Sequence, residues 1–132
     1  MNPLRSIIAL VGGFAIMAFL VFVLVAVVAW IFPVKIGAPT TLYLVANLVL
    51  SALAALAGGY ATASLAPGRP RMHAAVLALM VLAMSLSQLA SPPPGQPNWY
   101  PGALSVIGPL FAQLGGFLRR PRNTATTIPV SP

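Results

Sequence analysis

Residues 7–32 form one uninterrupted apolar run, in which the Trp30 indole carries the only polar side-chain group. A helix of about 20 such residues crosses the hydrocarbon core of a bilayer. The run is also longer than the apolar core of a secretory signal peptide, which has about 7–15 residues. We therefore interpret it as a retained membrane span, which ends at Pro33 because proline and the following "KIGAPT" segment break a helix.

Three further apolar runs follow, at residues 41–65, 72–90 and 99–118. The "APGRPR" segment separates the second span from the third, and the proline-rich segment 91–98 predicts an extended loop before the fourth. Pro109 lies within the fourth run and should kink its helix. The sequence thus predicts an all-α polytopic membrane protein. It is an up-and-down bundle of four transmembrane helices within residues 1–118, followed by a polar, disordered tail at 119–132.

The composition excludes several classes of function. The 132-residue chain has no Asp, Glu or Cys, and its net charge is +7. It therefore lacks the carboxylates used in acid–base catalysis, in proton relays and in calcium or magnesium sites, and it lacks thiolates. We expect no enzyme activity, no cofactor and no bound metal. Nucleic acid is not an expected partner either, because the few basic residues lie beside the membrane spans.

The basic residues predict an orientation. With four spans, only Lys35 falls on the side opposite to the two termini. Positively charged loops stay in the cytoplasm, so both termini are expected to be cytoplasmic. The opposite interface would hold four aromatic side chains, those of Trp30, Tyr43, Trp99 and Tyr100. The termini and the loop beside them hold the arginines Arg5, Arg69, Arg71, Arg119, Arg120 and Arg122.

Five of these arginines form a predicted basic surface at the cytoplasmic face. The surface suits anionic phospholipids of the bilayer, with each contact worth on the order of 1 kcal/mol. The same charges can serve only to set the topology, and an acidic partner subunit is a further alternative. The five are Arg69, Arg71, Arg119, Arg120 and Arg122.

Three glycine doublets, each followed by an aromatic residue, fall near the cytoplasmic ends of the predicted spans. Small residues let helices approach closely in lipid, where little hydrophobic force drives them together. We interpret the doublets as a helix-packing layer; a ligand-facing role or coincidence are the alternatives. A ladder at four-residue spacing also places the second span at the centre of the bundle. The doublets are Gly12-Gly13, Gly58-Gly59 and Gly115-Gly116, and the ladder is Ser51, Ala55, Gly59 and Ala63.

Polar side chains inside a membrane often mark a functional site. His73 follows the basic loop, and we weigh a proton-carrying or headgroup role against an interfacial imidazole bonded to backbone or water. Gln113 and Asn47 suit hydrogen bonds between helices, which are usually structural.

The strings "AGGYATASLAPGRPRMHA" (57–74), "NWYPGAL" and "LGGFLRR" resemble a family of small, uncharacterised four-span proteins of the bacterial inner membrane. The resemblance covers most of residues 41–120. It implies a location in the inner membrane and carries no activity and no site residues with it.

These features favour a non-catalytic accessory subunit or scaffold of the bacterial inner membrane, which acts alone or in a larger complex. The alternative is a small homo-oligomeric transporter or channel, which should show interrupted helices and polar groups near the membrane midplane. An enzyme acting on lipids is a third class, which the lack of acidic residues disfavours.

Overall fold

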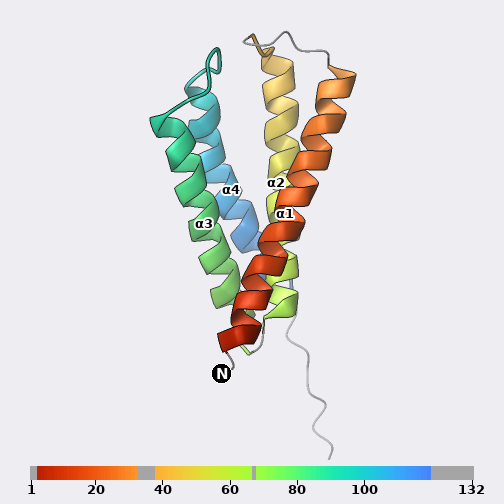
Figure 1. Cartoon of the computed structure of the whole chain (residues 1–132), viewed down its shortest axis with the longest axis vertical. Coiled ribbons are helices and arrows are strands. Elements are labelled where there is room, and N and C mark those ends of the chain that lie inside the picture. Colours follow the sequence, from red (N-terminus) through yellow and green to blue (C-terminus); the bar gives the residue numbers. More distant parts are fainter. Residues whose placement is uncertain (1–2, 33–37, 67, 120–132) are drawn as a thin grey trace, which may run out of the picture.

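The computed structural model describes residues 3–32, 38–66 and 68–119. These residues form four helices, which cross the molecule in alternating directions (Figure 1). The predicted all-α, up-and-down four-helix bundle is therefore confirmed, and each helix is long and apolar enough to span a membrane. The helices are α1 (Pro3–Ile31), α2 (Thr41–Leu65), α3 (Pro70–Ala90) and α4 (Trp99–Leu118).

Local sequence signals account for the helix ends. α1 begins at Pro3 rather than at residue 7, and α3 begins at Pro70 rather than at residue 72. Proline suits the first turn of a helix because its missing N–H has no partner there. The Thr40 hydroxyl caps α2 by accepting a hydrogen bond from the Tyr43 N–H at 3.3 Å. Pro109 lies inside α4, which continues past it as one helix.

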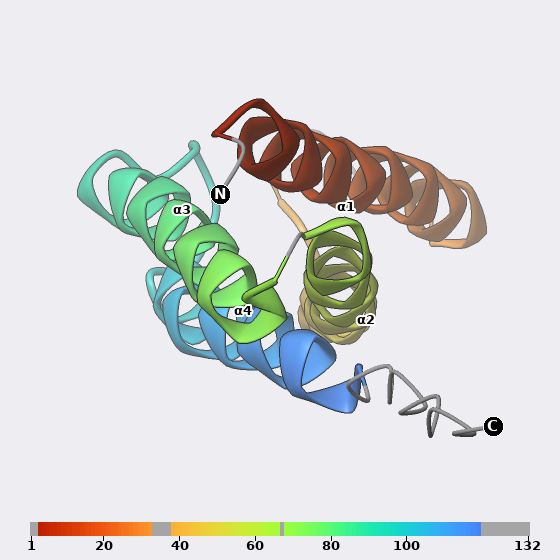
Figure 2. The same ribbon diagram turned by 90° about the horizontal axis from the view of Figure 1, so that it is seen from below.

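α2 contacts all three other helices, whereas α1 makes few contacts with α3 and, among the described residues, none with α4. The α1–α2 and α3–α4 hairpins lie close together where α1 begins and α4 ends (Figure 1). We call this the closed end of the bundle. The hairpins diverge toward the opposite end, which we call the open end. Seen from below the closed end, α1 and α3 flank the α2–α4 pair (Figure 2).

A small core joins the four helices at mid-height. It consists of one buried residue from each helix: Met17, Ala55, Ala78 and Ala112. Three of these are alanines, so the helices can approach closely there. The large apolar side chains lie mostly on the outside, as those of Phe22 and Val106 do. Such exposure is expected in lipid, since the surrounding acyl chains are as apolar as the side chains.

The segment between α3 and α4 differs from the expected extended loop because it contains a tight turn. The Gln96 N–H donates to the Pro93 carbonyl at 3.2 Å. Gly95 has a φ of 78°. A glycine at positive φ after Pro94 is typical of a type II turn. The turn reverses the chain just before α4 and brings Gln96 into contact with the bundle.

Candidate binding groove

A groove lies between the two hairpins in the half of the bundle toward the open end. It has two compartments, with volumes of about 500 Å³ and about 560 Å³. Both volumes fall within the range of small-molecule sites, about 300–1,000 Å³. The compartments form one continuous groove because they share the lining residues Val21, Val25, Ser51, Gln88 and Leu104.

The larger, apolar compartment has its floor on α2 and α4, where Ala55 and Gly108 lie, and its walls on α1 and α3. Met17 and Ala55 of the core bound it toward the closed end. Its rim is open, since Phe22 of α1 is 74% exposed and Met84 of α3 is 52% exposed. The compartment therefore opens sideways between α1 and α3, toward the surrounding lipid.

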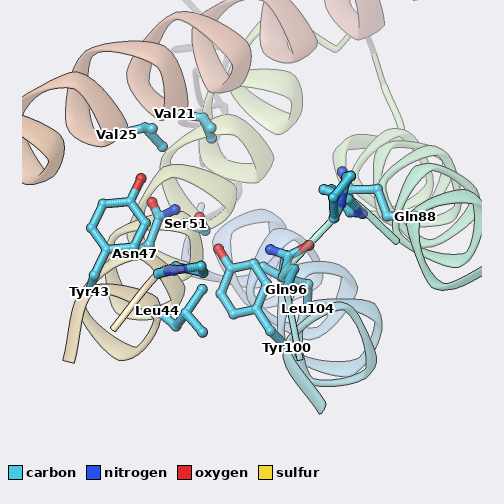
Figure 3. Close-up of a pocket in the computed structure, with 13 residues that line it drawn as sticks. Val21, Val25, Tyr43, Leu44, Asn47, Ser51, Gln88, Gln96, Tyr100 and Leu104 are labelled. Atoms are coloured by element: carbon cyan, nitrogen blue, oxygen red, sulfur yellow. The ribbon is translucent and has the colours of Figure 1, made fainter. Parts of the chain in front are cut away.

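The polar compartment lies at the open end. Tyr43 and Asn47 of α2, Gln96 of the turn and Tyr100 of α4 line it, and their side chains gather in one cluster (Figure 3). Tyr100 is only 4% exposed. Its side chain lies near those of Asn47 and Tyr43. The Trp99 ring meets the Tyr100 ring edge to face, with centroids 5.9 Å apart.

Two oxygens of the polar compartment lack a hydrogen-bond partner within the part of the chain that the structure describes. They are Oδ1 of Asn47 and Oε1 of Gln96, and both are buried. Leaving a buried acceptor unpaired costs about 1–3 kcal/mol. The Ser85 hydroxyl in the apolar compartment, by contrast, donates to the Val81 carbonyl at 2.9 Å. Unused acceptors in the groove are thus found at its open end.

The closed end is packed through the glycine doublets. Between α1 and α2, a Cβ on Gly13 would overlap Thr62, and a Cβ on Gly58 would lie 2.6 Å from the Met17 Cβ. Both positions need glycine for the helices to stay at this distance. Gly12 is less constrained, since it faces only the flexible tip of a leucine side chain at 3.0 Å.

The glycines between α2 and α4 face the backbone of the other helix rather than a side chain. A Cβ on Gly59 would overlap the Ala112 carbonyl, and a Cβ on Gly115 would overlap the Leu56 carbonyl. Gly116 lies against a side-chain methyl group of α3. The α2–α4 contact is therefore backbone against backbone, with no room for a side chain.

The small-residue ladder of α2 continues this packing toward the groove. Ala55 and Ala63, four residues before and after Gly59, are buried. Ser51 is half-buried and lines both compartments. One face of α2 thus changes along its length from a packing surface to a groove floor.

The described arginines of the basic surface lie at the closed end. Arg69 and Arg71 are exposed, and the Arg71 guanidinium lies 5.2 Å from the centroid of the Phe117 ring. The Arg119 guanidinium donates a hydrogen bond to the Ala63 carbonyl near the end of α2. These contacts tie the start of α3 to the end of α4, and the end of α4 to α2. The two remaining residues of the surface lie outside the described residues: Arg120 and Arg122.

The other polar candidates lie outside the groove lining. His73 is 6% exposed, and its Nδ1 donates to the Arg69 carbonyl at 2.9 Å. The Gln113 Oε1 is buried without a partner among the described residues, as are hydroxyls of Ser6 and Thr62. None of these four lines either compartment. Of the three intramembrane polar candidates, only Asn47 belongs to the groove.

Sequence reasoning missed most of the polar compartment. The sequence predicts that Tyr100 lies at the membrane interface, but it does not predict that this side chain is buried and faces the groove. Gln96 lies in the segment 91–98, for which the sequence predicts only an extended loop. One signal was present, since Tyr43 and Asn47 are four residues apart and so share a face of α2.

No protein-family model, curated protein or solved structure matches the chain. These comparisons thus do not support the resemblance to four-span inner-membrane proteins. The chemistry of the groove has to be argued from the residues of the chain itself.

Proposed function

We propose that the protein is a non-catalytic accessory subunit located in a membrane. It binds a membrane-soluble molecule in the groove between its two hairpins. The observation that supports this function is the pairing of two compartments. The apolar compartment opens sideways toward lipid. The polar compartment forms the part of the groove that lies at the open end of the bundle. A bundle that served only as a packed scaffold would have no need for such a groove.

The lining supports binding rather than catalysis. The chain contains no carboxylate side chain and no thiol, and His73 is its only histidine. His73 lies at the closed end and bonds to backbone. Among the described residues that line the groove, the tyrosines Tyr43 and Tyr100 are the only titratable groups. Nucleophilic or acid–base chemistry would need an activated group in reach of the bound molecule.

A location in the bacterial inner membrane, with both termini in the cytoplasm, belongs to the same proposal. The described arginines Arg5, Arg69, Arg71 and Arg119 lie at the ends of helices that meet at the closed end. The positive-inside rule then puts the closed end at the cytoplasmic surface. Anionic phospholipid headgroups would neutralise these charges there.

The test is to extract the protein from native membranes in a mild detergent and determine the mass and composition of the species. We expect a small apolar molecule, with or without partner polypeptides in a fixed ratio. Ser51→Trp should displace the molecule because Ser51 lies where the compartments join. Leu53→Trp is the matched control, since Leu53 is 50% exposed and lines neither compartment. Retention of the molecule by Ser51→Trp would contradict the proposal.

A homo-oligomeric transporter or channel is the second candidate. Gly108 and Pro109 support it, because Gly108 lines the groove and a proline in a transmembrane helix is a site of adjustment. The continuity of α4 favours the function of a binding subunit over that of a transporter, since transporters typically bind their substrates at interrupted helices. Recovery of a pure homo-oligomer that conducts a solute in liposomes would favour the transporter.

A further inference from the structure

We infer that the groove takes a neutral amphiphile whose head group donates a hydrogen bond, of the chemical class of a diacylglycerol or another long-chain alcohol. The inference rests on the proposed function and specifies the ligand. The head would lie in the polar compartment and an acyl chain in the apolar compartment.

The hydrogen-bonding groups of the polar compartment define the head. Oδ1 of Asn47 and Oε1 of Gln96 are acceptors, and both are buried without a partner among the described residues. They come from α2 and from the turn before α4, on opposite sides of Tyr100 in the cluster (Figure 3). A hydroxyl group can donate to one of them. A head without an O–H or N–H group, such as an ester, leaves both acceptors unpaired at a cost in binding.

Charge in the lining argues for a neutral head. The described residues that line the two compartments include no arginine, lysine or histidine, and the chain has no aspartate or glutamate. A phosphate or an ammonium group would therefore enter the polar compartment without a counterion, which is costly at low dielectric. The described arginines that could pair with a phosphate lie at the closed end.

The direction of the groove matches the direction of a lipid molecule. The polar compartment lies at the open end, beside the edge-to-face Trp99–Tyr100 pair. From Asn47 to Ala55 the groove floor follows eight residues of α2. This is about 12 Å at 1.5 Å per residue, comparable to the depth of one leaflet, about 15 Å of a 30 Å core. An acyl chain that starts at the head therefore ends near the core.

The opening between α1 and α3 supplies the route. Phe22 and Met84 form an exposed rim on α1 and α3, which make few contacts with each other. An amphiphile can thus pass into the groove from its own leaflet without leaving the membrane. Such a route keeps the acyl chain in an apolar environment throughout, so no large desolvation barrier opposes it.

The experiment uses the full chain in phosphatidylcholine nanodiscs and a diacylglycerol with a photoreactive diazirine in its acyl chain. The labelled residues are mapped by peptide mass spectrometry. Two competitors are compared: 1,2-dioleoylglycerol, which has a free hydroxyl group, and its acetate ester, which has none. We expect labelling at the walls around Val21 and Val81. We also expect the alcohol to compete about threefold to tenfold better than the ester, as one lost hydrogen bond predicts.

Variants test which oxygens accept the bond. Asn47→Leu and Gln96→Leu should each reduce the advantage of the alcohol over the ester. Gln96 lies in a loop, so its variant leaves the helix interfaces intact even if Asn47→Leu disturbs α2. Asn98→Ala is the matched control, because Asn98 is exposed in the same loop and lines neither compartment.

The outcomes separate this inference from the proposed function. Labelling in the groove with equal competition by alcohol and ester would overturn the hydroxyl-bearing head and leave groove binding standing. Labelling spread over lipid-facing positions such as Val106, without enrichment in the groove, would overturn both. Crosslinks between two copies of the chain across the groove would also overturn both, since the groove would then be a subunit interface.

Discussion

The two ends of the α2–α4 pair contrast sharply, although the same two helices form both. At the closed end, Gly59 lies against the Ala112 backbone and Gly115 lies against the Leu56 carbonyl. At the open end, the same helices carry Asn47 and Tyr100, and a groove separates the two hairpins. At the closed end, α2 and α4 meet through backbone contact. At the open end, they face each other through polar and aromatic side chains.

The difference shows that a glycine in a helix does not by itself bring a neighbouring helix close. Gly102 lies in α4 near the open end, yet a Cβ there would meet nothing within 4 Å. Gly115 in the same helix has no such space. Because lipid provides little hydrophobic force between helices, the local size of both surfaces sets the distance. At the closed end the glycines of the doublets other than Gly12 lie against backbone or Cβ atoms of a neighbouring helix, whereas Gly102 near the open end has no such contact among the described residues.

The largest expected effect is a difference in cysteine labelling between the two ends of the bundle, which shows which end faces the cytoplasm. The chain has no cysteine, so single cysteines report without background. Ser91→Cys, in the exposed loop of the open end, should react with a membrane-impermeant maleimide in intact cells. Ser131→Cys, near the C-terminus, should react only after the cells are permeabilised, because the positive-inside rule keeps the arginine-rich segments in the cytoplasm. The reverse pattern would show that the open end of the bundle faces the cytoplasm.

The next effect tests the closed end against the open end within α4. Gly115→Ala should lower the free energy of unfolding by about 1–3 kcal/mol, the usual cost of overpacking, because the new methyl group meets backbone. Gly102→Ala should be neutral or stabilising by up to about 1 kcal/mol, since alanine is the better helix former and has space there. Unfolding in mixed micelles, followed by circular dichroism, measures both.

Equal effects of the two alanine substitutions would contradict the contrast between the ends. The helices would then tolerate a wider spacing at the closed end. Gly12→Ala offers an intermediate case, because the neighbouring leucine side chain can move. Its cost should fall between those of the other two.

The sequence predicted the closed end better than the open end, for a physical reason. Long apolar runs, prolines and glycine doublets are local signals, and they predict the helices of the bundle directly. The groove is different because it depends on side chains from all four helices. Tyr100 has the sequence context of an interfacial aromatic, and only the approach of Asn47 shows that it faces inward.

Gln96 illustrates the same limit. Its role depends on the turn at Pro93–Gln96, in which Gly95 adopts a positive φ. The "PPPG" letters are compatible with a turn, but they are equally compatible with the extended loop that we expected. The position of Gln96 follows from the turn together with the packing of α3 and α4, and neither can be derived from the segment alone.

A smaller effect is expected from the arginine contact that links α4 to α2. Arg119→Leu removes the hydrogen bond to the Ala63 carbonyl and should lower the free energy of unfolding by about 1 kcal/mol. Arg69→Leu removes the same charge from an exposed side chain and should change it by less than about 0.5 kcal/mol. Both are measured in a non-ionic detergent, where lipid charge does not contribute. A loss as large for Arg69→Leu would assign the effect to charge rather than to the contact.

The smallest effect is expected at Gln113, which lies in α4 toward the closed end. Its Oε1 is buried without a partner among the described residues, so Gln113→Leu removes a group that contributes no bond there. The free energy of unfolding should change by no more than about 1 kcal/mol in either direction. Diacylglycerol labelling should also remain unchanged, because Gln113 does not line the groove.

The small effect expected for Gln113→Leu is informative when it is compared with the effect of Asn47→Leu on the labelling. Both substitutions replace an amide by leucine in the same bundle, and both amides have an oxygen without a partner among the described residues. If only Asn47→Leu changes the selectivity of labelling, the unpaired acceptors differ in function, and the open end carries the binding site. If instead Gln113→Leu abolished transport of a solute with assembly intact, the pathway would run through the closed end. The binding-subunit interpretation would then give way to the transporter.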